Sequence, residues 1–148
     1  MINKYLFVFL FSWISNLAQS QNIDEQKNTS KTEIISELVD SPTDLVQRQL
    51  DAYNERNIES FLELYDNNVE AYLYPTNKIA FKGKEAMKKI YSKIFKETPN
   101  LHCELINRIT QGNKVIDKER VQFGNDIIEV VAIYFIEKNK ITKIHFIN

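Results

Sequence analysis

The chain has 148 residues, of which 43% are hydrophobic and 26% are charged, and its formal net charge is −1. This length suits one domain, and the lack of a basic excess argues against partners such as nucleic acid or an anionic membrane. The only cysteine, Cys103, excludes an internal disulfide, so we expect the hydrophobic core alone to hold the fold.

The first segment, MINKYLFVFLFSWISNLAQSQ, has the pattern of a secretory signal peptide. A basic residue, Lys4, precedes an apolar run from Tyr5 to Ile14, and small residues follow at Ala18 and Ser20. That run is about ten residues long, whereas a helix that spans a bilayer needs about twenty. We therefore predict residues 1–20 as a signal peptide cleaved near Ser20. The mature protein would be periplasmic or secreted, without membrane contact; an uncleaved anchor is the alternative.

Residues 21–40 are polar with scattered apolar positions, which is typical of a linker, so the predicted folded domain is residues 41–148. Ser41 is placed to cap a first helix, because Pro42 would follow it at the first helical position. Apolar residues then recur at helical spacing: Leu45, Val46, Leu50 and Tyr53.

Two further helices are predicted in the first half of the domain. A short one starts at Asn57 and ends before Asp66, and its buried side would hold Ile58, Phe61, Leu62, Leu64 and Tyr65. A longer one follows Gly83, over residues 84–95.

Alternating side chains and turn sequences predict six strands. Turns at Gly112-Asn113, Gly124-Asn125 and Lys138-Asn139 join the last four strands into an antiparallel meander. The helices come before this meander, so the order predicts an α+β domain with three helices packed on one face of a curved antiparallel sheet. The predicted strands cover residues 69–75, 79–81, 101–110, 114–123, 126–137 and 140–147.

Three segments together resemble the SnoaL-like branch of the nuclear transport factor 2 superfamily, which shares the ketosteroid isomerase-like fold. They are AYNERNIESFLELY, the F-x-G-K-E-A pattern at Phe81–Ala86, and the closing strand ITKIHF. The resemblance covers residues 43–148. It implies a cone in which the helices and the concave sheet face enclose a pocket, and many members are homodimers through the convex face.

The catalytic relatives are ketosteroid isomerases and polyketide cyclases, and the isomerase residues are not matched here. Where the family's carboxylate base precedes a proline, this chain has Leu73-Tyr74-Pro75. The tyrosine donor of the family falls near Gln49, and its protonated Asp falls on Val131. The resemblance therefore implies the fold without this isomerase mechanism.

Strand alternation, with its inner face assigned from the resemblance, proposes which side chains line the pocket. Asp117, Glu119 and Glu129 would face inward, and close carboxylates raise the pKa of one of them, which suits a general acid or base. These three are the candidate catalytic residues, and a solvated rim of strand-end charges is the alternative. Candidate ligand-binding residues are Tyr53, Tyr72, Tyr74, Asn107 and Phe135, because such pockets combine apolar walls with a few polar groups.

The register of the 101–123 hairpin decides part of this assignment. A three-residue turn at Gln111–Asn113 pairs Asn107 with Asp117 and Glu104 with Arg120, and this is the register we favour. A two-residue turn pairs Arg108 with Asp117 instead, and a slip of one residue reverses the faces of the strand. That alternative would turn His102 inward.

No metal signature is present, since His102, His145 and Cys103 lack the spacing of a metal site. Only three glycines occur, and none forms a phosphate-binding loop. We therefore predict no metal and no cofactor.

The outer face of the sheet is predicted to be apolar, which marks an interface and favours a homodimer. The residues assigned to this face are Ile128, Val130, Ala132, Tyr134, Ile136, Ile141 and Ile147.

Two functions remain open. One is an exported, non-catalytic protein that binds an apolar small molecule in the cone. The other is an isomerase- or cyclase-like enzyme that uses Glu119, Glu129 or Asp117 as general acid or base. A domain that only mediates assembly would instead have a closed core and no cavity.

Overall fold

The computed structural model describes residues 40–147. The predicted signal peptide, and the predicted linker up to residue 39, lie outside the described residues. The elements in chain order are α2 (Pro42–Asn54), α3 (Ile58–Glu63), β1 (Tyr65–Tyr74), β2 (Lys78–Lys82), α4 (Lys84–Glu97), β3 (His102–Gln111), β4 (Lys114–Phe123), β5 (Asp126–Glu137) and β6 (Lys140–Ile147).

The helix starts follow the predicted caps. Ser41 Oγ accepts a hydrogen bond of 3.2 Å from the Asp44 amide, with Pro42 in the first turn of α2. Asn57 Oδ1 accepts one of 3.1 Å from the Ser60 amide at the start of α3. The end of α3 differs from the prediction, because Tyr65 already belongs to β1 and pairs with Ile141 of β6. Sheet pairing there overrides the helical spacing of the sequence.

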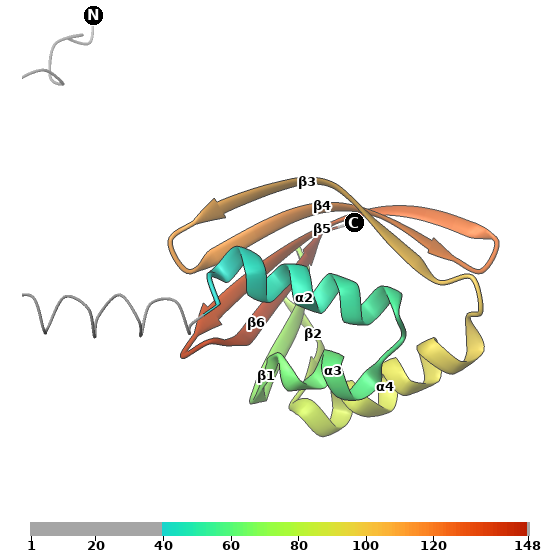
Figure 1. Cartoon of the computed structure of the whole chain (residues 1–148), viewed down its shortest axis with the longest axis horizontal. Helices are drawn as coiled ribbons and strands as arrows, with labels where there is room; N and C mark the ends of the chain where they lie inside the picture. The colour runs from blue at the N-terminus through green and yellow to red at the C-terminus, as the bar shows by residue number, and fades with distance from the viewer. Residues whose placement is uncertain (1–39, 148) are drawn as a thin grey trace, which may run out of the picture. The chain divides into compact units, whose positions relative to one another are not determined.

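The six strands form one sheet in the order β2-β1-β6-β5-β4-β3. Every neighbouring pair is antiparallel except β1 and β6, which are parallel. Helices α2, α3 and α4 lie on one side of the curved sheet (Figure 1). The predicted α+β class, with three helices on the concave face, is confirmed.

An aromatic cluster joins the three helices. The ring of Phe61 on α3 lies 4.7 Å from that of Tyr91 and 5.5 Å from that of Phe95, both on α4. Tyr53 on α2 lies 5.5 Å from Phe95. Such tilted and edge-on ring pairs stabilise packing beyond their burial, so the cluster holds the three helices against one another.

A β-bulge reconciles the two registers considered for the hairpin of β3 and β4. Near the turn the pairing is the two-residue alternative, with Arg108 opposite Asp117, so the favoured Asn107–Asp117 pair is wrong. The register shifts between Leu105 and Asn107, and beyond the bulge Glu104 lies opposite Arg120 as in the favoured register. A bulge adds one residue to one strand, so each half of the hairpin follows a different predicted pairing.

The inner face of β5 is also opposite to the prediction. The two-residue turn at Gly124-Asn125 pairs Phe123 with Asp126 and therefore Glu119 with Val130. Odd positions of β4 consequently share a face with even positions of β5. The residues predicted to point outward thus point toward the helices: Ile128, Val130, Ala132, Tyr134 and Ile136.

On β6, Ile141 is buried, because a second bulge between Phe135 and Ile136 places it opposite Ile136. Its predicted outward orientation is therefore wrong, whereas Ile147 lies opposite the outward position Val131 as expected. None of the helices within residues 40–147 is both long and apolar enough to cross a membrane.

Candidate functional site

A cavity of about 260 Å³ lies between the helices and the concave face of the sheet. Apolar and aromatic side chains make up most of its wall, and among residues 40–147 Glu119 is the only carboxylate in it. Leu73, Phe123 and Ile128 contribute to the wall while remaining more than a third exposed, so they mark its opening to solvent. The remaining lining residues are Gln49, Leu50, Tyr53, Tyr65, Tyr91, Ile94, Cys103, Val121, Val130, Tyr134 and Phe146.

Glu119 projects from β4 into this cavity and is only 6% exposed. Burial raises its pKa to about 7, the negative charge of Asp117 adds to the rise, and hydrogen bonds from Tyr134 and Cys103 oppose it. The Tyr134 hydroxyl donates to Glu119 Oε1 over 3.1 Å. This carboxyl group is therefore able to hold or release a proton near neutral pH.

Asp117 is fully buried but does not line the cavity. Arg108 Nε donates to its Oδ1 and Arg108 Nη2 to its Oδ2, each over 2.7 Å. Arg108 Nη1 also donates to Gln47 Oε1 over 3.0 Å and to the Thr43 carbonyl over 3.3 Å. The pair therefore anchors α2 on β3 and β4, which is a structural role.

Four tyrosines line the cavity from four elements: Tyr53 (α2), Tyr65 (β1), Tyr91 (α4) and Tyr134 (β5). Burial raises the pKa of each hydroxyl, and nearby Glu119 raises it further. They are accordingly neutral hydrogen-bonding groups at physiological pH.

Gln49 adds a second polar group to the cavity wall. Its side chain is buried and hydrogen-bonds Tyr65, whereas its Oε1 atom has no hydrogen-bond partner among residues 40–147. A buried polar atom without a partner is costly, so it marks a place where a ligand or a water molecule would bind favourably.

Of the candidate site residues, Glu119 and Tyr53 line the cavity. Glu129 instead lies on the outer face, where its carboxylate pairs with Lys118 at 3.1 Å and Arg120 at 3.3 Å. The inward orientation predicted for Glu129 is wrong, because β5 presents its even positions to the helices.

The other four candidate ligand residues also lie outside the cavity. The Tyr72 hydroxyl donates a hydrogen bond of 2.6 Å to Glu70 Oε2, and the Tyr72 ring stacks on that of His145. Phe135 lies beside His145 on the outer face of the sheet. Tyr74 is 57% exposed. The bulge in β3 leaves Asn107 opposite Lys118, which is exposed.

Sequence reasoning missed several lining residues: Gln49, Tyr65, Tyr91, Cys103 and Tyr134. Signals in the sequence could have found two of them, Gln49 and Tyr134. Gln49 lies one helical turn before Tyr53 on α2, so both share a face. Tyr134 follows from counting pairs outward from the two-residue turn at Gly124-Asn125.

The carboxylate base, tyrosine donor and protonated Asp of the family's isomerases have no counterparts at the matching positions of the described chain. Leu73 and Gln49 line it, whereas Val131 lies on the outer face beside Val130 and Ala132, neither of which is acidic. Among the described residues, no group of three or more His, Cys, Asp or Glu is arranged to hold a metal ion.

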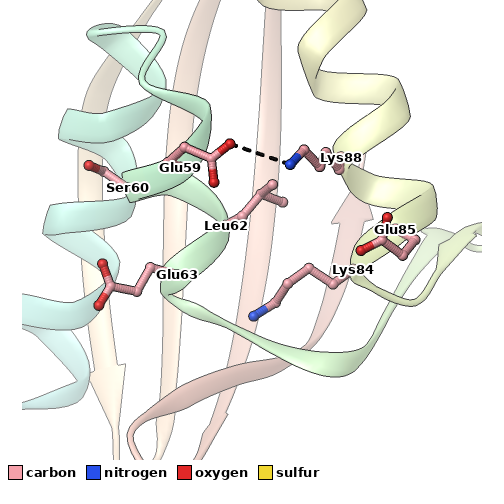
Figure 2. A pocket seen from close by; sticks show the side chains of 7 residues that line it. All are labelled: Glu59, Ser60, Leu62, Glu63, Lys84, Glu85 and Lys88. Carbon is pink, nitrogen blue, oxygen red and sulfur yellow. Dashed lines mark hydrogen bonds and ion pairs between the residues drawn. The ribbon is translucent and has the colours of Figure 1, made fainter.

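A second hollow of about 430 Å³ lies on the surface between α3 and α4 (Figure 2). Its charged side chains are Glu59, Glu63, Lys84, Glu85 and Lys88, and Glu59 pairs with Lys88 at 3.3 Å. The hollow is larger than the cavity but open and of mixed charge. It lacks the apolar walls typical of a small-molecule site.

The cone of sheet and helices around one cavity defines the nuclear transport factor 2-like class of protein. The family model of the SnoaL-like domain matches residues 46–144, and the chain belongs to this family. No curated protein matches the chain.

Solved structures show the same fold. A cystatin fold protein from Novosphingobium aromaticivorans is 21% identical, with a TM-score of 0.70, over 74% of this chain and 99% of that one. An NTF2-like protein of unknown function from Cytophaga hutchinsonii is 20% identical, with a TM-score of 0.63; the match covers 72% of this chain and 88% of that one. A provisionally assigned ketosteroid isomerase from Kribbella flavida is 15% identical, with a TM-score of 0.61; the match covers 70% of this chain and 73% of that one. At these identities the likeness shows the fold alone.

Proposed function

We propose that this domain binds a small, largely apolar molecule in the cavity between its helices and its sheet. The observation that carries the proposal is an apolar and aromatic wall that holds two buried polar side chains, Glu119 and Gln49. Small-molecule sites typically have this composition. The volume of about 260 Å³ lies just below the usual range of drug-sized sites, so the ligand is a small one.

Native mass spectrometry of the protein purified from its own host tests this proposal, because a retained molecule appears as added mass. Val130→Phe fills the cavity beside Glu119 and should abolish retention. Val131→Phe is the matched control, since Val131 is the next residue of β5 and faces outward. Equal retention by both variants would place the ligand elsewhere and refute the proposal.

Acid–base catalysis is the second candidate function, favoured by the raised pKa of Glu119. A carboxyl group with a pKa of about 7 in a cavity matches the working pH of a general acid or base. The Kribbella flavida protein suggests isomerase chemistry, in which a base moves a proton between carbons of an unsaturated ketone. Here the base would be Glu119, because the family's own base position is Leu73 or Tyr74.

A small ketone that fits the cavity tests this candidate. Cyclohex-3-enone isomerises to the conjugated ketone, whose ultraviolet absorbance reports the rate. The enzyme hypothesis predicts a rate above that of buffer alone, lost in Glu119→Gln and kept in Glu104→Gln, an exposed carboxylate of β3. Equal rates in protein and buffer would leave ligand binding as the function.

For assembly, we propose a homodimer through the outer face of the sheet. One row of outward residues crosses all six strands and is mostly apolar: Ile109, Ile116, Ile133, His145, Tyr72 and Ile79. Ile109 and Ile79 are 56% and 57% exposed. A mostly apolar row of this kind favours burial by a partner, and the family's homodimers support a second copy of the chain.

Export is proposed from the sequence alone. The mature protein would begin at Gln21 after cleavage following Ser20. Intact mass measurement of the protein isolated from its host tests this, since an uncleaved chain keeps the mass of residues 1–20.

A further inference from the structure

The cavity wall, as the structure describes it, holds one acidic side chain, Glu119, among neutral polar groups that both donate and accept hydrogen bonds. In the described part of the chain, Glu119 is its only carboxyl group, and its other titratable groups are tyrosine hydroxyls and the Cys103 thiol. Lysine, arginine and histidine do not occur among its lining residues. A ligand that carries a positive charge would match the electrostatics of this wall.

Glu119 lacks a cationic partner in the described part of the chain. Of its neighbours in β4 and β5, Asp117 pairs with Arg108, and Glu129 pairs with Lys118 and Arg120 on the outer face. Arg108 is held by both oxygens of Asp117 and does not line the cavity. The charge of Arg108 lowers the pKa of Glu119 from a distance, by less than burial and Asp117 raise it, so an ionised Glu119 still has no paired cation among residues 40–147.

Gln49 supplies a second, independent observation. Its Oε1 atom is a buried acceptor without a partner among residues 40–147. Gln49 is only 6% exposed and lines the same cavity as Glu119. An N–H group of a ligand would satisfy it, whereas a carboxylate or an ether would leave it unpaired.

The aromatic lining suits a cation as well. Tyr53, Tyr65, Tyr91 and Tyr134 border the cavity together with Phe123 and Phe146. The negative faces of such rings attract ammonium groups, and this attraction is larger where water is excluded.

We propose that the ligand of this cavity is a small apolar amine, bound as its ammonium ion, with the nitrogen at Glu119 and Gln49 and the apolar body among the tyrosines. This inference rests on the proposed ligand-binding function and narrows it to one chemical class. The cavity of about 260 Å³ equals roughly the space of nine water molecules, which suits an amine with a single ring.

Three probes of one shape and different charge test the inference: benzylamine, benzyl alcohol and benzoate. Binding to the purified protein is measured by calorimetry about one unit above the Glu119 pKa of about 7, where the carboxylate is ionised and the amine still protonated. Benzylamine should bind about 10- to 100-fold more tightly than benzyl alcohol, the usual effect of a charge-assisted hydrogen bond. Benzoate should bind least, because its charge repels Glu119.

Two variants assign the preference to its residue. Glu119→Gln keeps the shape of the side chain and removes its charge, so the preference for amine over alcohol should disappear while the alcohol still binds. Glu104→Gln removes an exposed carboxylate of β3, which pairs with Arg120, and should retain the full preference. An unchanged preference in Glu119→Gln would overturn the inference, since the amine would then be recognised elsewhere.

The probes also separate the two levels of the proposal. Equal binding of benzylamine and benzyl alcohol would overturn the amine inference and leave an apolar ligand site in place. Failure of all three probes, with no displacement of molecules retained from the host, would overturn both the amine inference and the proposed function.

Discussion

Arg108 and Asp117 face each other across the hairpin of β3 and β4 and form two parallel hydrogen bonds of 2.7 Å. The Asp117 side chain is completely buried and that of Arg108 is 11% exposed. Because Arg108 also donates hydrogen bonds to Gln47 and the Thr43 carbonyl, this pair connects the sheet to α2. Its position also brings a negative charge near Glu119, which contributes to the raised pKa of that group.

Removing one partner of this pair should destabilise the fold. Asp117→Leu leaves the Arg108 guanidinium without its counter-charge, and breaking a buried pair in this way costs roughly 3 kcal/mol. Urea unfolding of the variant measures the loss. The double variant Arg108→Met with Asp117→Leu should lose less, because no unpaired charge remains. Equal losses in both variants would contradict this account.

The stability of the protein should depend on pH through Glu119. The pKa of this carboxyl is about 7 in the folded state against an ordinary value of 4.5, so the folded state binds the proton more tightly. Its contribution to the free energy of unfolding is therefore largest below the unfolded pKa, falls as pH rises toward 7, and is constant above that. The shift corresponds to about 3 kcal/mol.

Glu119→Gln isolates this effect, because the amide does not titrate. The free energy of unfolding of the native protein minus that of Glu119→Gln should fall with rising pH across this window, as measured by urea unfolding at several pH values. Glu104→Gln serves as the exposed control. A pH-independent difference would mean that Glu119 titrates normally.

Glu129→Gln should leave both folding and ligand retention unchanged. The side chain of Glu129 is 49% exposed on the outer face, where Lys118 and Arg120 lower its pKa. Exposed ion pairs contribute little to stability. Thermal unfolding and native mass spectrometry check both expectations, and loss of the ligand would place Glu129 at the site after all.

Ile133→Lys should convert the proposed dimer into monomers. Ile133 lies at the middle of the outer apolar row, opposite Ile116 and His145, so a buried lysine there would lack a counter-charge. Light scattering after size-exclusion chromatography reports the mass. Ile90→Lys is the control, because Ile90 is 38% exposed on α4 and away from the sheet. A native protein that is already monomeric would refute the interface.

Much of the fold follows from local sequence. Ser41 and Asn57 cap helices as their side-chain chemistry predicts, and turns at Gly112 and Gly124 join the strands where predicted, although the turn at Gly112 is the two-residue alternative and not the favoured three-residue one. The resemblance to the SnoaL-like family is confirmed as well. These features depend on neighbouring residues in the chain or on a pattern along all of it.

The faces of the strands needed the tertiary structure. Side chains alternate with a period of two, so one bulge or one miscounted pair reverses a whole strand. This is why Glu129, Phe135 and Asn107 lie outside the cavity, while Val130 and Tyr134 lie within it.

The sequence by itself determined the helices, the strands, the family and the presence of acidic residues in β4. Only the tertiary structure decided that Asp117 forms an ion pair with Arg108, while Glu119 lies in an aromatic cavity without a paired cation among the described residues. The physical reason is that the charge state of a buried carboxyl depends on the groups that surround it in space. Those groups come here from β1, β3, β5, α2 and α4, which pairing across the sheet and packing of the helices bring together.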